Sequence, residues 1–526
     1  MNAARLLEHF DRVAEAPGAV PRLRRFILDL AVRGKLVEQD VADRVDSPSD
    51  FPFHIPTGWK VIPLGTLVNK LGAGSTPLGG KSIYRDDGVL FLRSQNIHDS
   101  GIRLDGGVAR IPRAVHERMS GTHVRPRDLL LNITGASIGR CAIVPDIFEE
   151  ANVSQHVAIV RLNDPELRHF VHLQLTSPIF QQRIHNVQVG VSREGLSMRR
   201  LRQFPMLIPP VGEQQRIVAK VDELMSLCDW LEAARAERER RRDRVVAASV
   251  HRVQLPATSS QHHNANGRDI EGLPERLTRR KDVEPLRRAL LNLAVTGRAY
   301  VSSRELVDSH AGSVSGEFKL PADWIWARLS MVCRSITDGD HLPPPKASTG
   351  VPFLVIGNLR QGRLVFEGCR HVPYEYYADL DPTRRPQRGD LLYTLVGSFG
   401  IPVIVDRDQQ FCVQRHIGIL RPSQNVDVRF LARLMASAFV FNQASRIATG
   451  IAQKTVPLRG LRAMAVPLPP LAEQRHIVEK LNELMAVCDR LEAQLAVGEA
   501  VSSRLLDALL HEALGHQSAP ASVQVQ

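Results

Sequence analysis

The sequence lacks the residue patterns that mark secreted, zinc-binding and membrane proteins. Its six cysteines form no Cys-x-x-Cys pair, and Cys228 and Cys488 occupy equivalent places in a repeated apolar pattern. We therefore expect buried free thiols rather than disulfides or zinc ligands. No apolar run approaches the ~20 residues of a membrane span. The N-terminus has no cationic stretch followed by an apolar one, so a signal peptide is not expected and the cytoplasm is the favoured location.

Motifs for nucleotide chemistry are incomplete. Gly74 and Gly80 precede a Lys-Ser pair as in a phosphate-binding P-loop, but five residues separate them where that motif has four. Two Pro-Pro pairs resemble part of the catalytic tetrad of adenine methyltransferases. Apolar residues take the places of its Asn or Asp and of its aromatic residue: Ile208, Val211, Leu468 and Leu471. No strand is followed by the glycine fingerprint of a dinucleotide-binding fold, so we assign no catalytic residue.

A metal loop is conceivable at 338–341, where the sequence reads Asp-Gly-Asp-His. This stretch lacks the further acidic ligands of a calcium loop and runs into three prolines, so a turn is the better interpretation. His156 and His416 stand at equivalent places before strands, but no nucleophile with a third partner accompanies them. We expect packing or hydrogen bonding from both histidines and assign no metal site.

The charge balance points to a polyanionic partner. Lys+Arg 68 against Asp+Glu 56 gives a net charge of +12, and the calculated pI is about 9.7. Nucleic acid is the first partner that such a surface suggests. A protein with merely surplus arginine fits the charge equally well. The 526 residues are enough for two to four domains.

One helix pattern occurs twice. Each copy opens with Pro-Pro-x-x-Glu-Gln, and the two glutamates, Glu213 and Glu473, are 260 residues apart. Apolar residues then recur every three or four positions, which is the a/d seam of a helix that pairs with another helix. The predicted seam residues are Ile217, Val221, Leu224, Cys228, Leu231, Ile477, Leu481, Leu484, Cys488 and Leu491. The simplest arrangement pairs the two long helices with each other.

The repeat extends over most of the chain. A short amphipathic helix ending in glycine is expected near 23–34 and again near 286–297, and a strand-rich block follows each. The frames of the two blocks match while their loops differ, which suggests two readers of one kind of ligand. The expected buried strands are Val89–Leu92, Asp128–Leu131, Val157–Val160, Val351–Ile356, Asp390–Tyr393 and Ile417–Leu420.

Basic and amide side chains beside glycines in these blocks are candidates for DNA contact. Arginine reads guanine, and asparagine or glutamine reads adenine, through paired hydrogen bonds in the major groove. The candidates are Lys81, Arg93, Gln95, Asn96, Arg140, Arg193, Asn358, Arg360, Gln453 and Lys454. The arginine-rich run at 235–244 is interleaved with acidic residues, so a solvated helix face is its default interpretation.

Taken together, the chain resembles the DNA-specificity subunit of type I restriction-modification systems. The resemblance rests on the duplicated Pro-Pro-x-x-Glu-Gln-x-x-Ile-Val entries at 209–218 and 469–478 and on the turns at 74–77 and 338–341. It also rests on the Asp-Leu-Leu strands that begin at Asp128 and Asp390, and on the Gln155-His156 and Arg415-His416 steps. These motifs occur in register over nearly the whole chain.

The resemblance implies an α+β fold of two mixed, strand-rich target recognition domains. Two long antiparallel coiled-coil helices would join them, with internal pseudo-twofold symmetry. The expected boundaries are an N-terminal helical segment at 1–45, target recognition domain 1 at 55–205, a central helix at 206–255, a linker at 256–282, a repeated helix at 283–300, target recognition domain 2 at 318–465, a C-terminal helix at 466–515 and a disordered tail at 516–526.

The resemblance also implies partners. Each domain would read one half of a split site in double-stranded DNA, and two methyltransferase subunits would dock on the helices. Motor-nuclease restriction subunits would join them. S-adenosylmethionine, ATP and magnesium would bind to those partners, and this chain would be a non-catalytic subunit without a cofactor. The alternative is a free-standing, two-headed DNA-binding protein without enzymatic partners.

Overall fold

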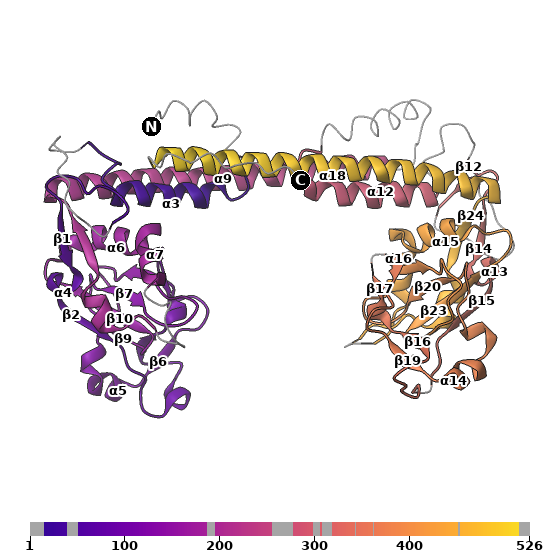
Figure 1. Cartoon of the computed structure of the whole chain (residues 1–526), viewed down its shortest axis with the longest axis horizontal. Helices are drawn as coiled ribbons and strands as arrows, with labels where there is room; N and C mark the ends of the chain where they lie inside the picture. Colours follow the sequence, from indigo (N-terminus) through magenta and orange to yellow (C-terminus); the bar gives the residue numbers. More distant parts are fainter. Residues whose placement is uncertain are drawn as a thin grey trace. The chain divides into compact units, whose positions relative to one another are not determined.

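The computed structural model describes residues 15–38, 51–186, 195–254, 277–297, 306–307, 318–341, 343–360, 362–450 and 453–514. The chain forms two compact units, Met1–Glu237 with Glu499–Gln526, and Arg238–Gly498. The predicted tail and most of the predicted linker lie outside the described residues. Two long helices, α9 (Val211–Gln254) and α18 (Leu471–Ala513), each begin in one unit and end in the other (Figure 1).

The first unit contains a four-stranded antiparallel sheet in the order β2-β10-β7-β8 and a three-stranded sheet in the order β6-β3-β9. Strand β9 runs parallel to β3. Strand β1 pairs with β11, the strand that precedes α9 in the sequence. The strands are β1 (Lys60–Pro63), β2 (Val68–Ala73), β3 (Val89–Leu92), β4 (Ile97–His98), β5 (Gly101–Ile102), β6 (Ala109–Ile111), β7 (Leu129–Asn132), β8 (Cys141–Ile143), β9 (Ala151–Val153), β10 (Val157–Leu162) and β11 (Pro205–Ile208). The helices are α3 (Ala19–Val32), α4 (Leu64–Leu67), α5 (Arg113–Arg118), α6 (Arg168–Thr176), α7 (Pro178–Asn186) and α8 (Met198–Arg202), with 3₁₀ turns η1 (Gly80–Ile83) and η2 (Ser94–Asn96).

The second unit repeats this connectivity. Its four-stranded sheet has the order β15-β23-β20-β21, and its three-stranded sheet has the order β19-β16-β22. Strand β14 pairs with β24, the strand that precedes α18 in the sequence. The strands are β12 (Leu306–Val307), β13 (Leu320–Pro321), β14 (Ile325–Arg328), β15 (Cys333–Asp338), β16 (Val351–Leu354), β17 (Leu359–Arg360), β18 (Arg363–Leu364), β19 (Arg370–Val372), β20 (Leu391–Thr394), β21 (Pro402–Ile404), β22 (Cys412–Val413), β23 (Ile417–Pro422) and β24 (Ala465–Leu468). The helices are α12 (Val283–Val295), α13 (Leu329–Val332), α14 (Tyr374–Asp379), α15 (Val428–Met435), α16 (Ala438–Ile447) and α17 (Leu458–Ala463), with the 3₁₀ turn η7 (Ile356–Asn358).

The two inner strands of each four-stranded sheet are covered on both faces. Along β10, Ala158 and Val160 join the core beneath the helices, while Val157 and Ile159 join the core shared with the three-stranded sheet. Successive residues of a strand face opposite sides, so a strand covered on both sides must be apolar throughout. This explains the uninterrupted apolar runs. A strand is found at each of the six predicted places, but β16 ends at Leu354, before the predicted end at Ile356, and β7 and β20 each begin one residue after the predicted start.

A short helix in each unit packs between parts of both long helices. In the first unit, α3 places Phe26 against Leu506 and Leu510 of α18, and Ile27 in the core that includes Val221 of α9. In the second unit, Leu286 and Leu290 of α12 share a core with Cys488 of α18 and Val246 of α9. Each unit is therefore completed by the last turns of the helix that begins in the other.

The predicted free thiols are confirmed. All six cysteines are free, and all but Cys369 are buried. Burial raises the pKa of the thiols of Cys141, Cys228, Cys333, Cys412 and Cys488. Within the described ranges, no helix has both the length and the apolar character needed to cross a bilayer.

Candidate nucleic-acid interface

Each unit displays a tight turn immediately before an inner strand of its four-stranded sheet. The turns are Ser154–Val157, before β10, and Gln414–Ile417, before β23. In both, the N–H of the fourth residue donates to the carbonyl oxygen of the first at 2.9 Å. The two middle residues stand at the tip: Gln155 and His156 in the first unit, Arg415 and His416 in the second. Gln155 and Arg415 are exposed.

Backbone hydrogen bonds fix both turns to equivalent neighbours. In the first unit they run from Ser154 N to Leu92 O at 2.9 Å, from Ile133 N to His156 O at 3.0 Å and from Gly74 N to Val157 O at 2.8 Å. In the second unit they run from Gln414 N to Leu354 O at 2.9 Å, from Leu395 N to His416 O at 2.9 Å and from Gly339 N to Ile417 O at 3.3 Å. The four-residue frame is therefore the same in both units.

Two glycines make this frame possible. A β-carbon at Gly74 would lie 2.1 Å from the carbonyl oxygen of Val153, and one at Gly339 would lie 1.9 Å from that of Val413. Both distances are far below van der Waals contact, so only glycine allows the preceding strand to approach the turn. Gly74 thus has a structural role that does not require a phosphate.

In the second unit the turn borders a cleft of about 270 Å³, whose lining includes Arg415, His416 and Thr455. Arg415 Nε donates to Nε2 of His416 at 3.3 Å. Burial and, after it, the charge of Arg415 lower the pKa of His416 below its ordinary 6.5. The lowered pKa favours the neutral ring, whose unprotonated Nε2 can accept this bond. In the first unit, Nδ1 of His156 lies within hydrogen-bonding distance of Oγ1 of Thr134.

The stretch at 338–341, predicted as a turn, begins with the last residue of β15 and continues through bends and a β-bridge between Asp340 and Gln414. Asp338 and His341 line the cleft. Nε2 of His341 lies 3.1 Å from Oδ2 of Asp338. The carboxylate of Asp340 accepts from the Tyr376 hydroxyl at 3.1 Å and lies 3.4 Å from Arg384. These side chains are held by contacts within the unit. Nowhere in the described residues do three or more His, Cys, Asp or Glu side chains gather as metal ligands would.

The predicted DNA-contact residues differ in their exposure. Gln453 and Lys454 lie beside the cleft, since Thr455 lines it and the carbonyl of Lys454 accepts from the N–H of Gly397 at 3.0 Å. Arg93 is half-buried over the ring of Tyr84, 5.8 Å from its centroid. The exposed candidates are Gln95, Arg140, Arg360, Gln453 and Lys454. Arg193 and the side chain of Lys81 lie outside what the structure describes.

Asn96 and Asn358 do not fit the predicted role of reading bases. Asn96 Oδ1 accepts from Arg93 N at 3.0 Å, and its Nδ2 donates to Arg103 O at 3.1 Å. Asn358 makes the equivalent bonds to Val355 N and Val365 O, both at 2.9 Å. Both side chains are buried, so their amides close loops and present no free edge to a base. Sequence position alone could not distinguish them from exposed amides.

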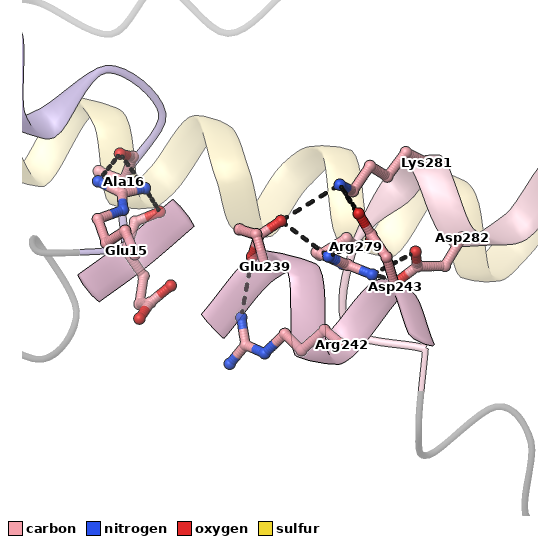
Figure 2. Close-up of polar contacts among 9 residues, drawn as sticks. Glu15, Ala16, Glu239, Arg242, Asp243, Arg279, Lys281 and Asp282 are labelled. Atoms are coloured by element: carbon pink, nitrogen blue, oxygen red, sulfur yellow. Dashed lines mark hydrogen bonds and ion pairs between the residues drawn. The ribbon is translucent and has the colours of Figure 1, made fainter. Parts of the chain in front are cut away.

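The arginine-rich part of α9 is engaged with neighbouring segments. Arg235 donates to the carbonyl oxygen of Ala16 at 3.4 Å in the first unit. In the second unit, Arg279 lies 2.7 Å from Glu239 and 2.9 Å from Asp243, and Lys281 lies 3.1 Å from Asp243. Figure 2 shows Glu239 and Asp243 facing Arg279 and Lys281, which precede α12. Ion pairs within the second unit thus engage Glu239 and Asp243.

The predicted seam residues face the short helices and the strand-rich blocks. Ile217, Val221 and Cys228 are buried in the core formed with α3 and the first block, and Leu224 and Leu231 pack against it. Ile477 and Leu481 are buried with α12 and the second block. Cys488, Leu484 and Leu491 belong to the α12 core, which also contains Val246 of α9. The described cores thus place a short helix against each seam, and coiled-coil pairing of the long helices stays a prediction.

Ion pairs join each short helix to a long helix at equivalent positions. Arg24 of α3 contacts Asp229 and Glu232 of α9. Arg287 of α12 contacts Asp489 and Glu492 of α18. The adjacent face of the long helices carries exposed apolar side chains. These are Leu227 (55% exposed) and Trp230 (70%) on α9, and Val487 (40%) on α18.

The tip residues Gln155 and Arg415 were not among the predicted contact residues. In the sequence they belong to the Gln155-His156 and Arg415-His416 steps, on which the family resemblance partly rests. The signal was present, because aligning the strands that follow places these two exposed residues at one position with different side chains.

The chain matches the model of the "Type I restriction modification DNA specificity domain" over residues 56–238 and 345–497. It is 24% identical to the EcoBI type I restriction enzyme specificity subunit of Escherichia coli over 403 residues, 75% of this chain and 74% of that protein. It is 21% identical to the E. coli EcoEI specificity subunit over an alignment of 582 positions, which covers 94% of each chain. The crystal structure of the HsdS subunit from Thermoanaerobacter tengcongensis aligns with 88% of this chain and 98% of its own, at 20% identity and a TM-score of 0.41.

Proposed function

The chain belongs to the family of the type I restriction-modification DNA specificity domain, and from this premise we propose that it is the specificity subunit of such a complex. In this proposal its two strand-rich blocks are target recognition domains. Each reads one half of a two-part sequence in double-stranded DNA. The chain itself catalyses no reaction.

The observation that carries this proposal is the repeated frame with unlike exposed residues. Both blocks have the same strand orders and the same pinned turn, yet Gln155 stands in one where Arg415 stands in the other. Two copies of one scaffold with different contact residues suit the recognition of two different half-sites. The net charge of +12 favours binding to the phosphate backbone.

The long helices supply the docking surface in this proposal. They pair as an antiparallel coiled coil about a pseudo-twofold axis, so that each half offers an equivalent face to one of two methyltransferase subunits. Leu227, Trp230 and Val487, exposed beside the buried seam, support a protein partner on this face, because water-exposed apolar patches favour association. The methyltransferase subunits hold S-adenosylmethionine, and restriction subunits hold ATP and magnesium.

Co-expression with the methyltransferase subunit tests this function. We expect a complex that methylates a motif of two short specific parts separated by a fixed gap, detected by modification-sensitive sequencing. DNA binding should weaken steeply with salt. Cleavage of DNA by the lone chain with magnesium would contradict the proposal. Specific DNA binding without any co-purifying partner would favour a free-standing two-headed DNA-binding protein.

Two kinds of helix variant separate docking from folding. Trp230→Asp should prevent methyltransferase binding while the chain stays folded, because that side chain is 70% exposed. Met331→Asp, at a 63% exposed position in the short helix α13, is the matched control and should assemble normally. Leu224→Asp and Leu484→Asp should loosen the short helices α3 and α12, break assembly and leave the blocks folded. Normal methylation by both seam variants would exclude a role for the seam.

A further inference from the structure

We propose that the two pinned turns are base-reading turns, in which Arg415 recognises a guanine in one half-site and Gln155 an adenine in the other. The inference rests on the proposed DNA-specificity function and assigns it to one equivalent position in each block. Three observations lead to it: the rigidity of the turns, the pattern of their differences and the space around Arg415.

Rigidity comes first. Each turn is closed by its own hydrogen bond and tied to three neighbouring segments by three more, at 2.8–3.3 Å. The close approach of the strand at Gly74 or Gly339 prevents the backbone from shifting toward that side. A side chain on such a backbone loses little conformational freedom on binding, which favours affinity and geometric precision.

The differences between the turns lie where specificity would require them. Their second tip residues, His156 and His416, are the same, and both offer a backbone carbonyl that fixes the neighbouring segment. The first tip residue is an exposed glutamine in one turn and an exposed arginine in the other. The two turns thus have the same backbone hydrogen bonds and differ in one exposed polar side chain. This arrangement is expected of a position that selects between bases.

The chemistry of the two side chains defines the bases. The guanidinium of Arg415 can donate two parallel hydrogen bonds to O6 and N7 of guanine, and the amide of Gln155 can pair with N6 and N7 of adenine. Arg415 makes one 3.3 Å bond, to His416, and borders a cleft of about 270 Å³, so it has room to turn toward DNA. Lys454, exposed beside the same cleft, is placed to contact a phosphate.

The test uses the assembled methyltransferase complex and the methylated motif as readout. Arg415→Gln should change the preferred base at one position of one half-site and lower methylation of the original site about 10- to 100-fold. Gln155→Arg should do the same in the other half only. Arg415→Lys, which keeps the charge but not the paired donors, should lose guanine preference and keep the salt dependence of binding.

The controls separate base reading from other roles. Lys454→Gln should weaken binding to all sequences equally and leave the motif unchanged, as a phosphate contact does. Arg388→Gln, at a 64% exposed arginine paired with Asp408, should change nothing. An unchanged motif in the Arg415 and Gln155 variants, or failure of both Arg415 variants to assemble, would overturn the inference while the proposed function stands. A wild-type complex that methylates no two-part motif would overturn both.

Discussion

Arg421 donates two hydrogen bonds to the carboxylate of Asp390, from Nε to Oδ1 and from Nη2 to Oδ2, both at 2.9 Å. The same carboxylate accepts the N–H of Gln387 at 2.9 Å. Asp128 of the first unit holds Arg161 and the N–H of Arg125 in the same way. In each unit the pair links the residue before one inner strand to the far end of the other inner strand, which begins at the turn. It therefore helps to hold together the two strands that lead to the candidate interface.

Replacing Asp390 with asparagine should destabilise the second unit by about 3–5 kcal/mol, because it leaves the largely buried guanidinium of Arg421 without its counter-ion. The side chains are 3% and 14% exposed. Hydrogen exchange resolved by peptide should show lower protection in β20 and β23. Asp408→Asn is the control: its pair with Arg388 is 77% and 64% exposed, so the loss should stay below about 1 kcal/mol. Equal losses would contradict the role given to the pair.

Alanine substitutions at two glycines should have opposite effects. Gly339→Ala should destabilise the second unit by several kcal/mol or prevent its folding, since the new methyl group would meet the carbonyl of Val413. Gly498 lies exposed within α18 with no atom near its β position, so Gly498→Ala should stabilise the helix by about 0.5–1 kcal/mol. Urea unfolding of both variants measures this. A stable Gly339→Ala protein with unchanged protection around the turn would refute the close-packing argument.

The attachment of α12 to α18 should weaken in acid. Hydrogen bonds from Arg280 and then Arg287 lower the pKa of the Glu492 carboxyl below its ordinary 4.5. The ionised form is therefore favoured in the folded chain, and its contribution is complete above pH 4.5 and lost as the pH falls through the lower folded value. Amide protection of α12 in wild type and Glu492→Gln should differ by a constant amount above about pH 5. The difference should vanish in stronger acid, and one that grew with acidity would have the wrong sign.

Alkylation of the native chain at pH 8 should single out Cys369. The other five thiols are buried with raised pKa values, to about 12 for Cys333 and Cys412, and the thiolate is the reactive form. Mass spectrometry after brief treatment with iodoacetamide should find Cys369 modified more than about tenfold faster than the others. In urea all six should react alike. Early labelling of Cys228 or Cys488 would mean that the short helices detach from the long ones.

Much of the fold was predictable because the sequence carries it twice. The buried strands followed from apolar runs, and the long helices from their proline entries and regular apolar spacing. The spacing identified a buried stripe on α9 but not what covers it. Ile217 and Val221 pack on the first block and α3. An apolar stripe can be buried by any apolar surface of the right length, so its spacing does not identify the surface that covers it.

The candidate site was harder to predict than the fold. Asn96 and Asn358 look like free amides beside glycines, but both turn inward to close loops. Whether an amide faces inward depends on backbone geometry that neighbouring residue types do not determine. Gln155 and Arg415 stand at the same position of two equivalent turns, and only hydrogen bonds from segments far apart in sequence show this equivalence.

The exchange of helix ends has a consequence for a chain cut between 254 and 277. The N-terminal fragment would keep α3 but lose its cover from Leu506 and Leu510, and the C-terminal fragment would keep α12 but lose Val246. Each fragment carries the piece that the other lacks. The two should therefore reassociate spontaneously when mixed, which makes the protein a natural candidate for fragment complementation and for exchanging one recognition block without altering the other.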